Sequence, residues 1–186
     1  MENFLSKYLS THKDIVNLLE SKKIAELLKI VKATRDTDNQ IFIIGNGGSA
    51  TCAAHLQVDL GKGASTNKSK KFKVFCPSNE IPWLTAIGND NGYDKIFSQQ
   101  IENFCKKDDL LIAISVSGNS PNLVEAFKKA KQSGLKTAAI VGDHNGQLIK
   151  LSDLCLIIPS KHYGHVEDIQ TLICHAIAYY FMEIEK

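Results

Sequence analysis

The feature that most constrains the fold is a series of short apolar runs that alternate with helical segments. Each run has the length of a strand and few polar residues: 41–44, 72–76, 110–114, 137–141 and 154–158. Strands that are apolar on both faces are typical of a parallel sheet covered by helices on both sides. The sequence therefore predicts a single doubly wound α/β domain with a five-stranded parallel sheet.

Helices are predicted before and between these runs. Residues 1–35 carry apolar side chains at three- and four-residue spacing, which predicts an N-terminal helical extension with Thr11 as a candidate cap between two helices. A glycine- and asparagine-rich turn is expected at 88–92. The other expected helices are 49–60, 81–88, 93–105, 120–133, a short one after Asn145-Gly146, and 166–185.

Composition narrows the class of protein. The 186 residues, 44% hydrophobic and 23% charged, are those of a single globular domain. A net charge of +2 is too small to indicate a nucleic-acid partner, and no apolar run approaches the roughly 20 residues that span a membrane. The N-terminus lacks a signal-peptide pattern, and the five cysteines are widely spaced and odd in number, so we expect reduced thiols and a cytoplasmic protein.

Two glycine- and serine-rich loops follow the first and third apolar runs. They are Gly45–Ser49 and Ser115–Ser120, and each precedes a predicted helix. A helix N-terminus presents free backbone N–H groups and a positive dipole end, which suits phosphate. Neither loop has a GxGxxG pattern or a Walker lysine, so a sugar phosphate fits better than a nucleotide. The alternative is a tight turn with ordinary capping, for which Ser120 before Pro121 is well suited.

Polar side chains also interrupt two predicted helices. His55 and Asp59 share one helix face at i, i+4, and Glu167, Asp168 and His175 punctuate the last helix. Histidines and carboxylates could ligate a divalent metal or act in acid/base catalysis. The alternatives are a hydrogen-bonded core histidine and carboxylates that complement a helix dipole.

Four motifs together resemble the SIS (sugar isomerase) domain family, most closely its phosphoheptose isomerases. They are GNGGSA, AIGNDNGYDKIFSQQI, ISVSGNSPNLVEA and HVEDIQTLICH, in this order along nearly the whole chain. The resemblance implies that residues 1–186 form one SIS domain, with 1–35 packing on it and on neighbouring subunits. It also implies a homotetramer with active sites between subunits.

The same resemblance implies roles for individual residues. His55 falls on a zinc ligand, and His175 on a residue that is both zinc ligand and catalytic acid/base. The expected substrate- and phosphate-binding residues are Asn46, Gly47, Gly48, Ser49, Asn89, Asp90, Ser115, Val116, Ser117, Ser120 and Glu167.

Two departures from the family concern the carboxylates. Asp59 stands where the family usually has Glu, and Glu167 where it usually has Gln. We expect both to bind zinc with His55 and His175, and one of them to be the catalytic base. The stretches 79–82 and 164–166 also differ from the family, which leaves the exact sugar open.

The expected activity is aldose–ketose isomerisation. The resemblance implies conversion of sedoheptulose 7-phosphate to a glycero-manno-heptose 7-phosphate through an enediol, without a nucleotide cofactor. This reaction is a first step toward nucleotide-activated heptose for lipopolysaccharide or capsule. The alternatives are an isomerase of another sugar phosphate, or a non-catalytic SIS module that binds a sugar phosphate or a protein partner.

Overall fold

The computed structural model describes residues 1–185 of the chain, so Lys186, the last residue of the expected domain, lies outside this range. A five-stranded sheet with the order β2-β1-β3-β4-β5 forms the centre, and all of its neighbouring strands are parallel. This sheet confirms the predicted fold class. The strands are β1 (Gln40–Ile44), β2 (Lys73–Phe75), β3 (Leu110–Ser115), β4 (Lys136–Gly142) and β5 (Leu154–Ile158).

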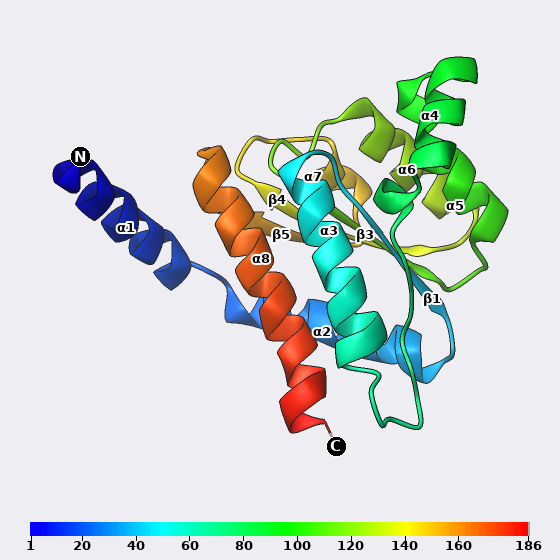
Figure 1. Cartoon of the computed structure of the whole chain (residues 1–186), viewed down its shortest axis with the longest axis horizontal. Coiled ribbons are helices and arrows are strands. Elements are labelled where there is room, and N and C mark those ends of the chain that lie inside the picture. The colour runs from blue at the N-terminus through cyan, green and yellow to red at the C-terminus, as the bar shows by residue number, and fades with distance from the viewer. Residues whose placement is uncertain (186) are drawn as a thin grey trace.

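Helices cover both faces of this sheet (Figure 1). One face packs against α2 (Ser21–Asp36), α3 (Gly48–Val58) and α8 (Tyr163–Tyr179). The other packs against α4 (Ile81–Asp90), α5 (Ser98–Phe104), α6 (Pro121–Gln132) and α7 (Leu148–Leu151). Successive side chains of a strand point to opposite faces, so Ile41 and Ile43 enter one core while Phe42 and Ile44 enter the other.

The first helix, α1 (Glu2–Asn17), lies at one end of the molecule (Figure 1), and Tyr8 and His12 join it to His165 of α8. Ile15 is its only buried residue, whereas Phe4 and Leu9 are 69% and 68% exposed. The expected cap at Thr11 is wrong, because Thr11 lies inside α1 and the break between α1 and α2 falls at residues 18–20. The apolar spacing lapses twice, between Leu9 and Ile15 and between Leu19 and Ile24, and the break falls beside the second gap while Thr11 lies in the first.

Three other predicted helix boundaries shift. Residues 88–90 belong to α4 instead of a turn, and the helix ends before Gly92, whose φ of 101° favours glycine. The helix expected over 93–105 is a 3₁₀ turn (Tyr93–Lys95) followed by α5. Both α3 and α8 continue into π-helical turns, at Asp59–Gly63 and Tyr180–Ile184.

None of the helices within residues 1–185 has the length and apolar character needed to cross a membrane.

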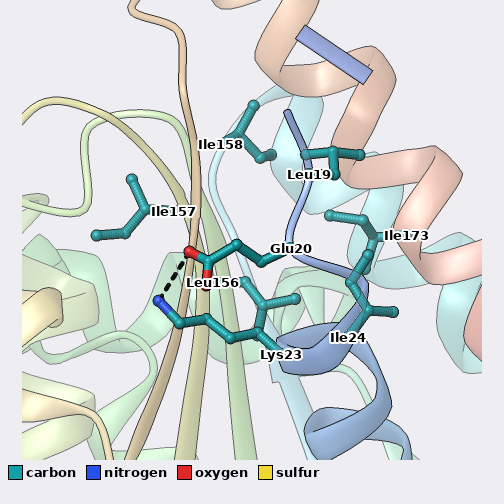
Figure 2. Close-up of a pocket in the computed structure, with 8 residues that line it drawn as sticks. All are labelled: Leu19, Glu20, Lys23, Ile24, Leu156, Ile157, Ile158 and Ile173. Carbon is teal, nitrogen blue, oxygen red and sulfur yellow. Dashed lines mark ion pairs between the residues drawn. The ribbon is translucent and has the colours of Figure 1, made fainter. Parts of the chain in front are cut away.

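The link between α1 and α2 covers the outer edge of β5 (Figure 2). Leu19 and Ile24 face Leu156, Ile158 and Ile173, and an ion pair of 3.1 Å joins Glu20 to Lys23 at the rim. The hollow between these side chains holds only about 10 Å³, which is at the lower limit for one water molecule. It is a packing gap and has no room for a ligand.

Buried Asp109 fixes the start of the central strands. Its two carboxylate oxygens accept hydrogen bonds from the backbone N–H groups of Gln40 (2.8 Å) and Lys106 (2.7 Å). The side chain belongs to a residue only 2% exposed, so water cannot replace these bonds. Asp153 plays a comparable part at β4, where it accepts from the backbone N–H and the hydroxyl of Thr137, but its side chain is 56% exposed.

We predict that Asp109→Ala lowers the free energy of unfolding by about 2–4 kcal/mol, because two backbone N–H groups lose a buried, charged acceptor. The matched substitution Asp153→Ala should cost less, since water can solvate the groups it leaves. Urea denaturation of both variants measures the difference. Equal losses would contradict the role given to Asp109.

Candidate active site

A pocket lies beyond the carboxyl ends of β1 and β3, where both glycine- and serine-rich loops end. Its volume is about 270 Å³. It is lined by Asn46, Gly47, Gly48, Ser49, Ser115, Val116, Ser117, Ser120, Tyr163 and Glu167. Nearly all of these were expected substrate-binding residues, and the position agrees with the rule that open α/β sheets bind ligands at the carboxyl ends of strands.

The N-termini of three helices reach this pocket. Gly48 begins α3, Ser120 immediately precedes α6, and Tyr163 begins α8. Figure 1 shows the starts of α3 and α8 at the same end of the molecule. The lining includes no lysine or arginine. Attraction for an anion must therefore come from helix dipoles, backbone N–H groups and hydroxyls.

The three serines of the second loop differ in availability. The Ser115 hydroxyl accepts a hydrogen bond of 3.0 Å from the N–H of Gly118, whose φ of 61° turns the chain. The Ser117 hydroxyl accepts a longer bond of 3.3 Å from Asn119. Ser120 makes no side-chain capping bond although it stands at the N-cap of α6. Ser115 therefore shapes the loop, and Ser120 has the hydroxyl most available to a ligand.

Ser49 points away from the pocket into the core. Its hydroxyl donates to Gln170 Oε1 at 3.2 Å, and Gln170 Nε2 donates to the carbonyl of Ile140 at 3.1 Å. Ser49 is only 4% exposed and Gln170 is fully buried. The hydroxyl of Ser49 thus joins α3 to α8, and only its backbone can serve the predicted substrate contact.

An amide pair between Asn46 and Asn122 joins the two loops. Each side chain donates to the other, at 3.0 Å and 2.9 Å. Asn122 lies in the first turn of α6, is 2% exposed, and was not identified from the sequence. Its only sequence signal is an asparagine directly after the N-cap and proline of a helix. The pair sets the spacing between the two loops.

Glu167 reaches the first loop from α8. A Cβ atom at Gly48 would lie 2.6 Å from Glu167 Oε1, so the absence of a side chain there lets the carboxylate approach the start of α3. A carboxylate at a helix N-terminus is electrostatically favourable. Glu167 therefore belongs to the end of the pocket formed by the first loop.

Farther along the same two helices, His55, Asp59 and His175 converge. The Nε2 atoms of the histidines are 3.4 Å apart, and they lie 3.6 Å and 3.7 Å from Asp59 Oδ2. Asp59 opens the π-helical turn after α3, a feature that often marks functional sites. Its Oδ2 atom is buried without a hydrogen-bond partner.

The donor set of this triad fits a zinc ion. Zinc–nitrogen bonds of about 2.0–2.1 Å in a tetrahedral site place neighbouring ligand atoms about 3.3 Å apart. The distances of 3.4–3.7 Å in the triad are close to this value. A bound cation would also satisfy the unpartnered Asp59 oxygen. The side chains of His55 and His175 are 51% and 42% exposed, which leaves the triad accessible.

Glu167 is not part of the cluster formed by His55, Asp59 and His175. It precedes His175 by eight residues, or about 12 Å along the helix axis. Its neighbour Asp168 accepts a hydrogen bond from Tyr8 of α1 at 3.3 Å. Metal binding by Glu167 stays a prediction.

Asn89 and Asp90 are also outside the pocket. They are exposed at the end of α4, where Asn89 Nδ2 donates to Asp90 Oδ1 at 2.7 Å. Neither residue lines the pocket of the same chain. Their expected contact with substrate stays a prediction.

Two buried cysteines support the contact between α3 and α8 near the triad. Cys52 Sγ and Cys174 Sγ are 3.7 Å apart, and both residues are almost fully buried. The hydrogen bond to Cys52 and burial raise the pKa of the Cys174 thiol. Cys174 therefore stays protonated and packs as a small apolar residue.

Comparisons with known proteins agree with this geometry. A family model for the SIS domain matches residues 3–142. A phosphoheptose isomerase from Helicobacter pylori (strain P12) is 35% identical over 182 residues, covering 95% of this chain and 93% of that protein. One from Sulfurimonas denitrificans is 37% identical over 155 residues, covering 83% and 79%.

A solved structure shows the same fold. A phosphoheptose isomerase from Neisseria gonorrhoeae has a TM-score of 0.89 at 24% sequence identity, over 98% of this chain and 99% of that one. Together with the family model and the two relatives, this likeness identifies the fold and the lineage. The chain belongs to the SIS domain family, in the group that contains the phosphoheptose isomerases.

Proposed function

We propose that this protein is a phosphoheptose isomerase that interconverts sedoheptulose 7-phosphate and a glycero-manno-heptose 7-phosphate. The observation that carries the proposal is the pairing, on α3 and α8, of a pocket suited to an anion with a His/Asp/His triad farther along the same helices. The first feature suits a phosphate, and the second suits chemistry on a carbonyl and its neighbouring carbon. The similarity to relatives named phosphoheptose isomerase supports the choice of substrate.

The phosphate is proposed to bind the second loop, at Ser117 and Ser120 and the N-terminus of α6. Binding there is remote from the reacting carbons, so its free energy can orient C1 and C2 without taking part in the chemistry. Val116 lines the same wall. The Asn46–Asn122 pair holds this wall at a fixed distance from the first loop.

The isomerisation moves a proton between C1 and C2 through an enediol, which needs a base and a group that moves protons between the two oxygens. Asp59 or Glu167 is the proposed base: Glu167 lies in the pocket, and Asp59 lies beside His175. Asp59 is proposed to hold the metal. His175 is proposed to transfer protons between the substrate oxygens.

His55, Asp59 and His175 are proposed to hold one zinc ion per subunit. When bound, zinc supplies Lewis acidity that stabilises a developing negative charge on a substrate oxygen. Glu167, expected from the sequence as a further ligand, would reach this ion only if its carboxylate moved toward His175. No nucleotide cofactor is proposed.

A homotetramer with active sites between subunits is the proposed assembly. The apolar side chains that α1 exposes, Phe4, Leu5 and Leu9, would pack on neighbouring subunits. A neighbour could also bring Asn89 and Asp90 to the pocket. In this proposal residues 1–186 form one SIS domain, and 1–35 serve both the domain and the assembly.

We propose a cytoplasmic enzyme whose product supplies heptose for lipopolysaccharide or capsule. The five cysteines are free thiols, which suits a reducing compartment. Isomerisation of another sugar phosphate is the alternative that the departures at 79–82 and 164–166 keep open.

The first prediction from the proposed function concerns His175. His175→Gln should lower kcat for sedoheptulose 7-phosphate by about 10²-fold or more, because the imidazole is proposed both to transfer protons and to hold zinc. Removal of zinc by a chelator should also abolish turnover, and added zinc should restore it. His12→Gln, a substitution on α1, is the control. Full activity of His175→Gln, or turnover only of other ketose phosphates, would refute the assignment.

The second prediction separates the two carboxylates. If Glu167 is the base, Glu167→Gln should lower kcat by about 10²–10⁴-fold while leaving the zinc content unchanged. Asp59→Asn should instead lose zinc, as measured by metal analysis of the purified protein. Asp168→Asn is the matched control on the same turn of α8. If Glu167→Gln keeps its kcat, Asp59 becomes the candidate base.

The third prediction concerns assembly. Leu5→Glu with Leu9→Glu should shift the protein to a smaller species, because charges would replace the exposed apolar face of α1. Analytical ultracentrifugation measures the mass, and Lys13→Glu on the same helix is the control. A wild-type protein that sediments as a monomer would defeat the tetramer.

A further inference from the structure

Tyr163 is the single aromatic side chain among the residues that line the pocket. It is the first residue of α8 and is 59% exposed. Its aromatic neighbour is His144, whose ring centre is 6.2 Å away at an angle of 64°. A large side chain in this position covers one side of the pocket without being needed to fill the interior.

The backbone on both sides of Tyr163 is held in place by α1. Tyr8 stacks on His165 with ring centres 4.1 Å apart and meets His162 edge-on at 5.8 Å. A Cβ atom at Gly164 would lie 2.6 Å from the Tyr8 hydroxyl, so any larger residue there would have to displace the Tyr8 side chain. Tyr163 thus projects from a fixed turn while its side chain stays free to meet a ligand.

The pocket lacks a strong donor with long reach. Its lining contains no lysine or arginine, Ser115 is bonded to its own loop, and Ser49 faces the core. A phenol hydroxyl is a neutral donor at the end of a rigid apolar ring. Such a group can complete the coordination of a phosphate and exclude water from it, without adding a charge beside Glu167.

We propose that Tyr163 is a substrate-binding residue that covers the phosphate in the pocket and donates its hydroxyl hydrogen to a phosphate oxygen. This inference rests on the proposed function for its choice of ligand. It makes Tyr163 a determinant of specificity for phosphorylated sugars, because a ligand without the phosphate leaves the hydroxyl unpaired. The ring of Tyr163 covers one side of the pocket, and its hydroxyl selects for ligands that carry a phosphate.

The test compares two ligands and two substitutions. Tyr163→Phe keeps the wall and removes the donor, so it should raise the Kd of inorganic phosphate, measured by calorimetry, by about tenfold. It should raise KM for sedoheptulose 7-phosphate by the same factor and leave kcat unchanged. Tyr163→Ala removes the wall as well and should raise both constants further. Tyr180→Phe, near the far end of the same helical segment, should change neither.

The outcomes are distinct. An unchanged Kd for phosphate in Tyr163→Phe overturns the proposal, even if KM rises, because the hydroxyl would then contact the sugar instead. A fall in kcat with unchanged KM also overturns it. If the wild-type protein binds phosphate but isomerises nothing, the proposed function fails while the phosphate titration still tests Tyr163. Equal urea midpoints of the variants and the wild type exclude misfolding as the cause.

Discussion

The packing of α3 against α8 is the contact on which both parts of the candidate site depend. At one end, Gly48 gives Glu167 the space to reach the start of α3. In the middle, Ser49 and Cys52 meet Gln170 and Cys174 in a buried layer. Farther along, His55 and Asp59 meet His175. A change in the relative position of these helices would disturb the pocket and the triad together.

Much of the fold could be predicted because its signals are local. Continuous apolar runs predicted every strand of the parallel sheet, and i, i+4 spacing placed His55 and Asp59 on one helix face. The glycine and serine loops likewise pointed to the pocket. One boundary was misplaced because two polar gaps interrupt the apolar spacing, at 10–14 and 20–23, and local spacing does not tell which gap ends a helix; the break lies at 18–20, beside the second gap.

The details of the site could not be predicted because they depend on partners distant in sequence. In the sequence, Asn122 is only a residue in the first turn of a helix. The structure shows that it pairs with Asn46, which lies 76 positions earlier. The sequence predicts that Ser49 faces a ligand, whereas in the structure its hydroxyl donates a hydrogen bond to Gln170. Glu167 and His175 share a helix, but only the axial rise shows how far they lie from one another.

The amide pair of Asn46 and Asn122 makes the spacing of the two loops insensitive to pH and salt concentration. Carboxylates and imidazoles change charge with pH, and ion pairs weaken as salt is added. Two amide side chains that hydrogen-bond to one another neither change charge with pH nor depend on ionic attraction. The protein thus fixes the width of its ligand site with groups that never ionise, and the spacing stays constant while the groups at its reactive end exchange protons.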